Sequence, residues 1–279
     1  MNTICVCGAG TMGSGIAQVA AQAGCATVLY DPNTTVLENA KKNISKSLTL
    51  LFEKGRISEN EPAAVISRLH FTSNLQDCKA NVFIEAIIEN AEVKISLFNE
   101  LAKINSEDSI FASNTSSLSI SKIAEAITHP ERVIGMHFFN PAPIMKLVEV
   151  VKTGFTSENT SNIIIDLVQK MGKTAVICKD SPGFIVNRVA RPYYIESLRL
   201  VEEGLAEFMV LDKLLEATGF KMGPFKLMDL IGNDINYAVS CSVYEQSGKP
   251  GRLKPSVIQE QKVAAGELGR KTGKGYYEY

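Results

Sequence analysis

The sequence holds one histidine and one glutamate whose surroundings indicate acid–base chemistry, His137 and Glu149. His137 ends an apolar run that predicts a strand. Glu149 lies inside Leu147–Val151, which is apolar on both faces and predicts a buried strand. A buried carboxylate without a partner is costly, so Glu149 needs one. If the two strands lie side by side, Glu149 fixes the imidazole tautomer and the other ring nitrogen acts as a base. The pattern equally allows a core histidine with an unrelated glutamate. The other two histidines, His70 and His129, lie in polar, turn-like segments.

A glycine-rich turn near the start of the chain has the spacing of a dinucleotide site, G-x-G-x-x-G over residues 8–13. It follows a predicted strand and opens a predicted helix, which is the context that this motif requires. Gly8 permits the tight turn, Gly10 lets the backbone approach a pyrophosphate, and Gly13 allows close packing of helix on strand. Thr11 and Met12 complete the predicted cofactor-binding turn. The alternative is a glycine turn that merely starts a helix.

An acidic residue, Asp31, ends the second predicted strand. A carboxylate at this position accepts hydrogen bonds from the adenosine ribose of a dinucleotide. It would also repel a 2′-phosphate, and residues 32–35 offer no Arg or Lys to hold one. The sequence therefore favours NAD over NADP.

Other polar residues occupy places where a ligand could reach them. Ser113–Ser117 follows a predicted strand and is typical of a hydroxyl-rich helix start, a role compatible with binding. Glu89 follows another strand at the same sheet edge. Asn187 lies on the first helix of the second half and could point toward a ligand. Ser47 and Lys54 share one helix face, although the pattern alone indicates a solvated lysine at position 54.

The predicted secondary structure changes near residue 183, from alternating strands and helices to helices alone. Before it, short apolar runs alternate with helical periods, which predicts a mostly parallel sheet covered on both faces. After it, helical periods continue almost without strand signal. We therefore expect a sheet domain over 1–182 and a helical domain over 183–279. The predicted strands are Thr3–Cys7, Thr27–Tyr30, Val82–Ile84, Ser109–Ala112, Arg132–Met136, Leu147–Val151 and Thr174–Cys178. The predicted helices of the second half are Ile185–Gly204, Asp212–Thr218, Phe225–Tyr244 and Pro255–Ala265.

Charge and cysteine content exclude several classes of function. The 279 residues include 29 Lys and Arg against 30 Asp and Glu, a net charge of −1. We therefore expect no nucleic-acid or membrane partner, because neither electrostatic attraction nor a spanning segment is present. The six cysteines form no C-x-x-C pair, so no metal site is expected. This usage indicates a protein of the reducing cytoplasm.

Taken together, these motifs resemble the 3-hydroxyacyl-CoA dehydrogenase family over essentially the whole chain, most closely its short bacterial 3-hydroxybutyryl-CoA dehydrogenases. The resemblance implies a Rossmann-like α/β domain followed by an all-helical domain through which the chain forms a homodimer. The matching stretches are Gly8–Gly15, Phe83–Ala86, Ser113–Leu118, Gly135–Pro143, Lys146–Val150, Asp180–Arg188 and Gly269–Tyr277.

The resemblance also implies a role for each matching position. His137 is the general base and Glu149 its partner, while Ser116 and Asn187 bind the substrate oxygens near the reacting carbon. Asn140 and Ser116 border the nicotinamide. The remaining roles fall to Glu89 and Lys94, which contact the cofactor, and to Ser47 and Lys54, which hold the CoA moiety.

The implied reaction is NAD-dependent oxidation of an (S)-3-hydroxyacyl-CoA, such as 3-hydroxybutyryl-CoA, to the 3-oxoacyl-CoA, and its reverse. Two alternatives stay open. The scaffold could oxidise a sugar acid or another small hydroxy acid. It could also belong to a non-catalytic NAD-binding protein, because a fold does not determine a function.

Overall fold

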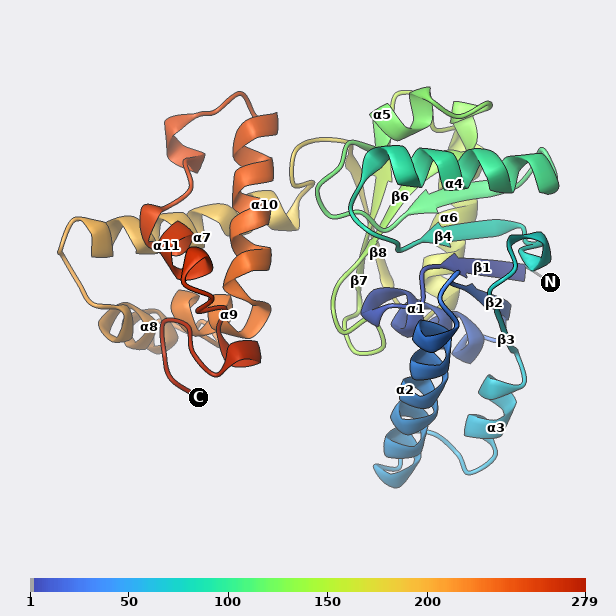
Figure 1. Cartoon of the computed structure of the whole chain (residues 1–279), viewed down its shortest axis with the longest axis horizontal. Helices are drawn as coiled ribbons and strands as arrows, with labels where there is room; N and C mark the ends of the chain where they lie inside the picture. The colour runs from blue at the N-terminus through green and yellow to red at the C-terminus, as the bar shows by residue number, and fades with distance from the viewer. Residues whose placement is uncertain (1–2) are drawn as a thin grey trace. The chain divides into compact units, whose positions relative to one another are not determined.

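A computed structural model describes residues 3–279, which divide into two compact units, one up to Asp180 and one from Ser181 to Tyr279. The strands all lie in the first unit. They are β1 (Thr3–Cys7), β2 (Ala26–Tyr30), β3 (Leu69–Thr72), β4 (Val82–Glu85), β5 (Ile110–Ser113), β6 (Val133–Phe138), β7 (Leu147–Lys152) and β8 (Thr174–Lys179). They form one eight-stranded sheet in the order β3-β2-β1-β4-β5-β6-β7-β8 (Figure 1). Every pairing is parallel except β6 with β7. The predicted fold class is confirmed.

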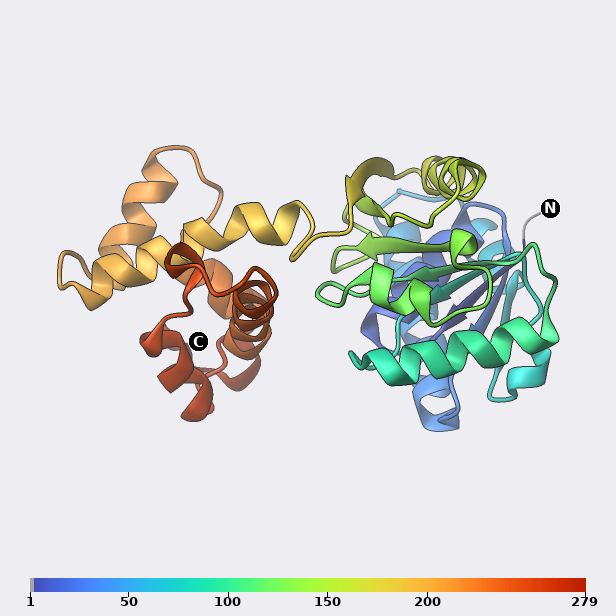
Figure 2. The same cartoon turned by 90° about the horizontal axis from the view of Figure 1, so that it is seen from above.

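Helices cover both faces of the sheet. They are α1 (Thr11–Gln22), α2 (Thr34–Glu53), α3 (Glu61–Ile66), α4 (Ala91–Ile104), α5 (Ile120–Glu125) and α6 (Glu158–Lys170). In Figure 2, α4 and α6 lie on opposite sides of the sheet. Short 3-10 helices add Leu75–Asp77 and Pro130–Arg132 to this unit.

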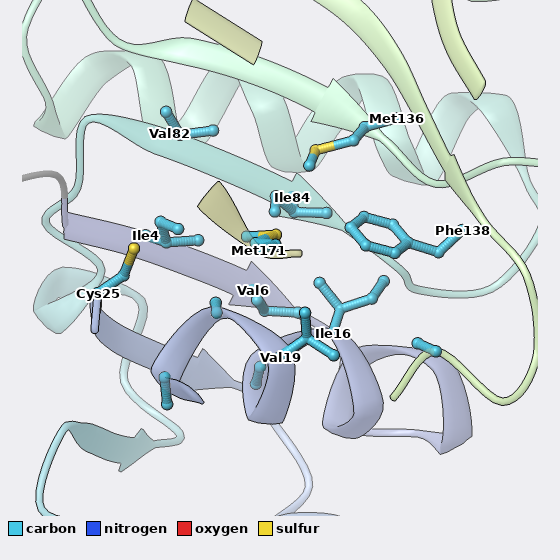
Figure 3. Close-up of a cluster of buried hydrophobic side chains, with 14 of the residues drawn as sticks. Ile4, Val6, Ile16, Val19, Cys25, Val82, Ile84, Met136, Phe138 and Met171 are labelled. Atoms are coloured by element: carbon cyan, nitrogen blue, oxygen red, sulfur yellow. The ribbon is translucent and has the colours of Figure 1, made fainter. Parts of the chain in front are cut away.

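The main core lies between the sheet and α1, α2 and α6. Figure 3 shows Ile4 and Val6 of β1 facing Ile16 and Val19 of α1. The opposite face packs on α4 and α5, where the rings of Phe83 and Phe111 stack at 5.3 Å between centroids. Because side chains alternate along a strand, residues of β1, β4 and β5 contribute to both layers.

One strand, β3, was not predicted, and His70 lies inside it rather than in a turn. This strand pairs only with β2, at the edge of the sheet. Only Thr72 among its four residues is buried, so its sequence shows no apolar run. A short, exposed edge strand therefore leaves little signal in the sequence.

The second unit consists of helices α7 (Val186–Glu202), α8 (Phe208–Ala217), α9 (Pro224–Ile231), α10 (Asn233–Gln246) and α11 (Val257–Ala264), with 3-10 helices at Gly251–Leu253 and Arg270–Thr272. The prediction of one helix over Phe225–Tyr244 is wrong. Gly232 separates α9 from α10 with a φ of 104°, a conformation that favours glycine. The apolar period continues across this break, which is why periodicity alone does not reveal it.

The last residues of the chain fold around one buried carboxylate, that of Asp229, which is 1% exposed. Its oxygens accept the backbone N–H groups of Tyr276 and Tyr277, both at 3.0 Å. A side chain at Gly275 would collide with this carboxylate, since a Cβ there would lie 2.0 Å from Oδ1. The tail motif therefore needs a glycine at position 275, because the chain passes too close to Asp229 for any side chain.

None of the helices described between residues 3 and 279 is long and apolar enough to cross a membrane.

Candidate active site

The histidine and glutamate singled out in the sequence contact one another. β6 and β7 pair antiparallel in a register that places His137 opposite Glu149. The Nδ1 of His137 lies 2.8 Å from Oε2 of Glu149. The histidine is 6% exposed and the glutamate 0%. The strand pairing that the sequence left open is therefore present, and it brings the buried carboxylate its partner.

This contact determines which imidazole nitrogen can exchange a proton. A carboxylate only accepts hydrogen bonds, so a carboxylate at Glu149 calls for the His137 tautomer with the hydrogen on Nδ1, which leaves Nε2 as the nitrogen that could exchange a proton. The ring packs against that of Phe139, with 4.5 Å between centroids. His137 projects from the sheet face covered by α5, because Gly135, two residues earlier, packs against Ile120 of that helix.

The glycine turn between β1 and α1 has the geometry of a pyrophosphate cradle. Gly8 has a φ of 98°, and a Cβ there would lie 2.6 Å from the carbonyl oxygen of Ala86. A Cβ at Gly13 would lie 1.7 Å from the carbonyl oxygen of Gly8. At Gly10, by contrast, a Cβ would meet no atom within 4 Å. The turn is thus closed toward the protein and open at Gly10, where a phosphate can approach the start of α1, which Thr11 and Met12 begin. These residues fit a dinucleotide.

Asp31 joins the end of β2 to the glycine turn. Its Oδ2 accepts the backbone N–H of Ala9 at 2.9 Å, and its Oδ1 accepts that of Asn33 at 2.9 Å. A carboxylate has about four lone-pair directions, so these two bonds leave room for ribose hydroxyls. Asn33 also caps α2, because its side chain accepts the N–H groups of Thr35 and Val36.

A buried ion-pair network lies beside this turn, between β4 and α4. The Nζ of Lys94 lies 2.5 Å from Oε1 of Glu85 and 3.2 Å from Oε2 of Glu89. Glu85 is 0% and Lys94 1% exposed. The second carboxylate oxygen of Glu85 accepts the hydroxyl of Ser113 at 2.7 Å. Lys94 thus forms ion pairs with two carboxylates, of which Glu89 is the more exposed.

Glu89 holds the polar loop after β5. Its Oε1 accepts the hydroxyls of Thr115 at 2.5 Å and Ser117 at 2.8 Å, and the backbone N–H of Ser116 at 3.3 Å. Burial alone would raise the pKa of Glu89, but Lys94 and the two hydroxyls outweigh it and hold the pKa below its usual value. Glu89 is therefore a carboxylate at neutral pH, and it positions Ser116.

The same loop is tied to the strand that carries the histidine. The side-chain oxygen of Asn114 accepts the backbone N–H of Phe138 at 2.8 Å. Ser119 caps the start of α5, and its hydroxyl donates at 2.8 Å to Asp180, which follows β8. Sequence reasoning missed Asn114 and Asp180 as positioning residues, although both follow predicted strands.

Asn140 lies on a loop between β6 and β7, which we call the Asn140 loop (residues 139–146). Its peptide bond to Pro141 is cis. The ammonium of Lys173 donates to the carbonyls of Ala142 at 2.5 Å and Met145 at 2.8 Å, and so fixes the loop from behind. Sequence reasoning missed Lys173 as well, since a lysine after a helix is usually solvated.

Three predicted site residues lie on other elements. Ser47 is half-buried on α2, and Lys54 is exposed and ends that helix. Asn187 lies in the first turn of α7, in the second unit. The structure brings together His137 with Glu149, and Ser116 with Glu89 and Lys94. Asn187 belongs to the helical unit, and the structure gives its position only relative to the other residues of that unit.

A dinucleotide-binding sheet domain with a buried His–Glu pair, followed by a helical domain, defines a class of NAD-dependent dehydrogenases. Residues 3–181 match the model of the 3-hydroxyacyl-CoA dehydrogenase NAD binding domain, and residues 183–279 match that of the C-terminal domain. The chain belongs to the 3-hydroxyacyl-CoA dehydrogenase family, and the predictions of this enzyme class and of NAD as cofactor are confirmed.

Several relatives are similar over the whole chain. A 3-hydroxyadipyl-CoA dehydrogenase of Escherichia coli is 43% identical over 100% of this chain, which spans 59% of that protein. A probable 3-hydroxybutyryl-CoA dehydrogenase of Deinococcus radiodurans is 42% identical, over 98% of this chain and 99% of the relative. The crystal structure of (S)-3-hydroxybutyryl-CoA dehydrogenase from Ralstonia eutropha matches with a TM-score of 0.96 at 36% identity, over 100% of this chain and 99% of that one.

Proposed function

We propose that the protein catalyses NAD-dependent oxidation of (S)-3-hydroxyacyl-CoA to 3-oxoacyl-CoA, and the reverse reduction. The observation that carries this proposal is the buried contact between His137 and Glu149. A proton must leave the 3-hydroxyl during oxidation, and a histidine oriented by a carboxylate is suited to take it. NAD, when bound, accepts the hydride from C3.

Each proton transfer is assigned to His137. In oxidation, its Nε2 takes the hydroxyl proton, and Glu149 stabilises the imidazolium that forms. In reduction, the same imidazolium returns the proton to the oxygen of the 3-oxo group. Ser116 and Asn187 orient that oxygen by hydrogen bonds, so that the reacting atoms keep a productive distance.

The remaining site residues bind the two ligands. The pyrophosphate lies on the glycine turn, which consists of Gly8, Gly10, Thr11, Met12 and Gly13. Asp31 binds the adenosine ribose. The nicotinamide is bordered by Asn140 and Ser116. Glu89 lies against the cofactor, with Lys94 behind it. Ser47 and Lys54 hold the CoA moiety.

The compartment, the assembly and the reference substrate are also proposals. All six cysteines are unpaired thiols, which supports a location in the reducing cytoplasm. Related mammalian proteins are named mitochondrial.

We propose a homodimer formed through the helical unit. Relatives are named for 3-hydroxybutyryl-CoA and for 3-hydroxyadipyl-CoA, so a four-carbon thioester serves as the reference substrate.

The test is the loss of NADH absorbance when purified protein meets acetoacetyl-CoA, beside parallel reactions with NADPH and with free acetoacetate. We expect turnover with NADH and the thioester only. The variant His137→Gln should lower kcat by about 10²–10⁴-fold with NADH affinity nearly unchanged. A matched control is His129→Asn, at an exposed histidine whose left-handed backbone suits asparagine.

Other outcomes would replace the proposal. Turnover of free acetoacetate would assign the protein to enzymes of small hydroxy acids. NADH binding without turnover of either compound would assign it to the non-catalytic class. Near-full activity of His137→Gln would remove the histidine from the mechanism.

A further inference from the structure

A buried arginine of the helical unit has only neutral partners. Arg191 lies on α7 and is 3% exposed. Its Nη1 donates to the backbone oxygen of Asn236 at 2.9 Å and to the hydroxyl of Ser240 at 2.8 Å. Its Nε donates to the backbone oxygen of Asn187 at 3.1 Å. The guanidinium carbon lies 4.9 Å from the ring centroid of Tyr194. Among residues 3–279, no carboxylate forms an ion pair with this arginine.

The missing counter-charge has an electrostatic consequence. Burial lowers the pKa of Arg191 to about 10, which records how poorly the surroundings solvate the cation. Neutral oxygens and an aromatic ring recover part of the hydration that a guanidinium loses on burial, whereas a carboxylate also supplies the opposite charge. The site around Arg191 is therefore short of one anion.

A second donor beside the guanidinium also lacks a partner. Asn236, on α10, is 2% exposed, and its Nδ2 has no hydrogen-bond acceptor among the described residues. Its Oδ1 accepts from Nε2 of Gln259 at 3.1 Å and lies 3.5 Å from Nη1 of Arg191. The Nη2 of Arg191 donates no hydrogen bond to a described residue either. A buried amide donor beside a guanidinium edge offers what the two oxygens of a carboxylate accept.

The place of Arg191 on α7 relates it to the substrate. Asn187, which we assign to the substrate oxygen, lies four residues earlier on the same helix face, a rise of roughly 6 Å. In a six-carbon acyl chain, the oxygens of a terminal carboxylate lie four bonds beyond C3; at about 1.5 Å per bond, the zigzag of an extended chain gives a reach of roughly 5 Å. The spacing of the two side chains along α7 therefore matches the length of such a chain.

We propose that Arg191 and Asn236 bind a carboxylate at the far end of the acyl chain, so that the enzyme prefers 3-hydroxyacyl-CoA thioesters of dicarboxylic acids. The proposal rests on the proposed function and narrows its substrate class. Arg191 is then a specificity-determining residue, because it distinguishes an acyl chain that ends in a carboxylate from one that ends in a methyl group.

The experiment compares 3-oxoadipyl-CoA with 3-oxohexanoyl-CoA as substrates for NADH oxidation. Both carry six carbons and the same CoA, so the phosphates of CoA contribute equally and only the terminal group differs. We expect kcat/KM of the wild-type protein to favour the carboxylate by at least about tenfold, the effect of one charge-assisted hydrogen bond. The variant Arg191→Met should reduce that preference by about tenfold to a hundredfold, and Arg191→Lys by less.

The matched control is Arg199→Met, two turns further along α7, where the arginine is partly exposed and bonds to Glu196 and to the carbonyl of Gly251. It should leave the preference unchanged. A wild-type preference near or below one would overturn the inference, as would an Arg191→Met variant that slows both substrates equally. Should Arg191→Met fail to fold, the wild-type preference and Arg191→Lys still decide. Turnover of the hexanoyl substrate alone would leave the proposed function standing, while turnover of neither would reject both.

Discussion

At the scale of single residues, buried charge organises the sheet domain. Lys94 lies between Glu85 and Glu89, and these three residues join β4, α4 and the loop of Ser116. Buried ion pairs contribute little net stability against well-packed apolar side chains, but removal of one partner costs about 3–5 kcal/mol. Their presence here is therefore better explained by position than by stability: they hold the loop of Ser116 against β4 and α4.

This network gives the protein a defined response to acid. The folded state lowers the pKa of Glu89, so its contribution to stability is present above the ordinary pKa of 4.5 and is lost as the pH falls through the lowered value. We expect the difference in Tm between wild type and Glu89→Gln to be largest near neutral pH and to shrink below about pH 4.5. Thermal unfolding followed by circular dichroism from neutral to acidic pH measures it.

The control for this prediction is Glu158→Gln, at a carboxylate whose side chain is 82% exposed. It should shift Tm little at any pH, because exposed ion pairs contribute little. A Tm difference for Glu89→Gln that stays constant across the acidic range would show that the charge of Glu89 does not stabilise the fold.

A site residue could be predicted from the sequence where its type differs from that of its neighbours in the chain. Glu149 could be predicted to need a partner because a carboxylate interrupts an apolar run. Arg191 and Lys173 gave no such signal, since a basic residue on or after a helix is usually solvated. Their burial depends on elements distant in sequence, namely α10 for Arg191 and the Asn140 loop for Lys173. Local patterns do not contain that information.

At the scale of elements, the Asn140 loop is held from two sides. Lys173, in the turn between α6 and β8, donates to two of its carbonyls. On the other side, Ala142 and Pro143 pack over Gly15 of α1, where an added Cβ would lie 3.2 Å and 3.1 Å from their side chains. The loop that carries Asn140 is thus fixed to the helix that begins at the glycine turn.

Removal of the ammonium should loosen this loop. Burial lowers the pKa of Lys173, and the two carbonyls offset part of the cost of burying its charge. We expect Lys173→Met to cost about 1–3 kcal/mol in stability, to raise KM for NADH several-fold and to lower kcat, because two carbonyls lose their donor. Urea unfolding and initial rates at a temperature where the variant is folded measure these effects.

Two companion variants separate positioning from stability. Lys173→Arg keeps a donor and should recover part of KM, whereas Lys170→Met, at an exposed lysine on the preceding helix, should change neither quantity. A Lys173→Met protein that loses stability but keeps the KM and kcat of the wild type would limit this lysine to a purely structural role.

Most elements could be predicted because each buries a regular apolar stripe. Two of the exceptions have local causes. β3 is an exposed edge strand with one buried residue, and α9 and α10 are separated at Gly232 by a backbone conformation that leaves the apolar period intact. The antiparallel pairing of β6 with β7 was the step that could only be supposed, because it depends on the path of the Asn140 loop.

At the scale of the whole molecule, each unit has its own core, but the helical unit also leaves several large apolar side chains exposed. Its core is formed by Tyr194, Leu198, Leu211, Phe225, Met228 and Tyr276. Along α8 and its flanks, Leu205, Met209, Val210, Leu214 and Phe220 are each at least half exposed. Exposed apolar side chains that gather on one helix are typical of an interface, and a second copy of the chain is the occupant implied by the family resemblance.

We therefore expect a homodimer in solution, measured as twice the mass of 30.4 kDa by size exclusion with light scattering. The double variant Val210→Glu and Leu214→Glu places two charges four residues apart on the exposed face of α8 and should yield monomers, because a buried like-charge pair opposes association. Phe155→Glu, at an exposed phenylalanine of the sheet domain, is the control and should stay dimeric.

A wild-type protein that is monomeric would remove the proposed interface. A double variant that stays dimeric at low micromolar concentration would place the interface elsewhere. Since the sheet domain carries both the glycine turn and Asp31, a folded monomeric variant should still bind NADH, which separates assembly from cofactor binding.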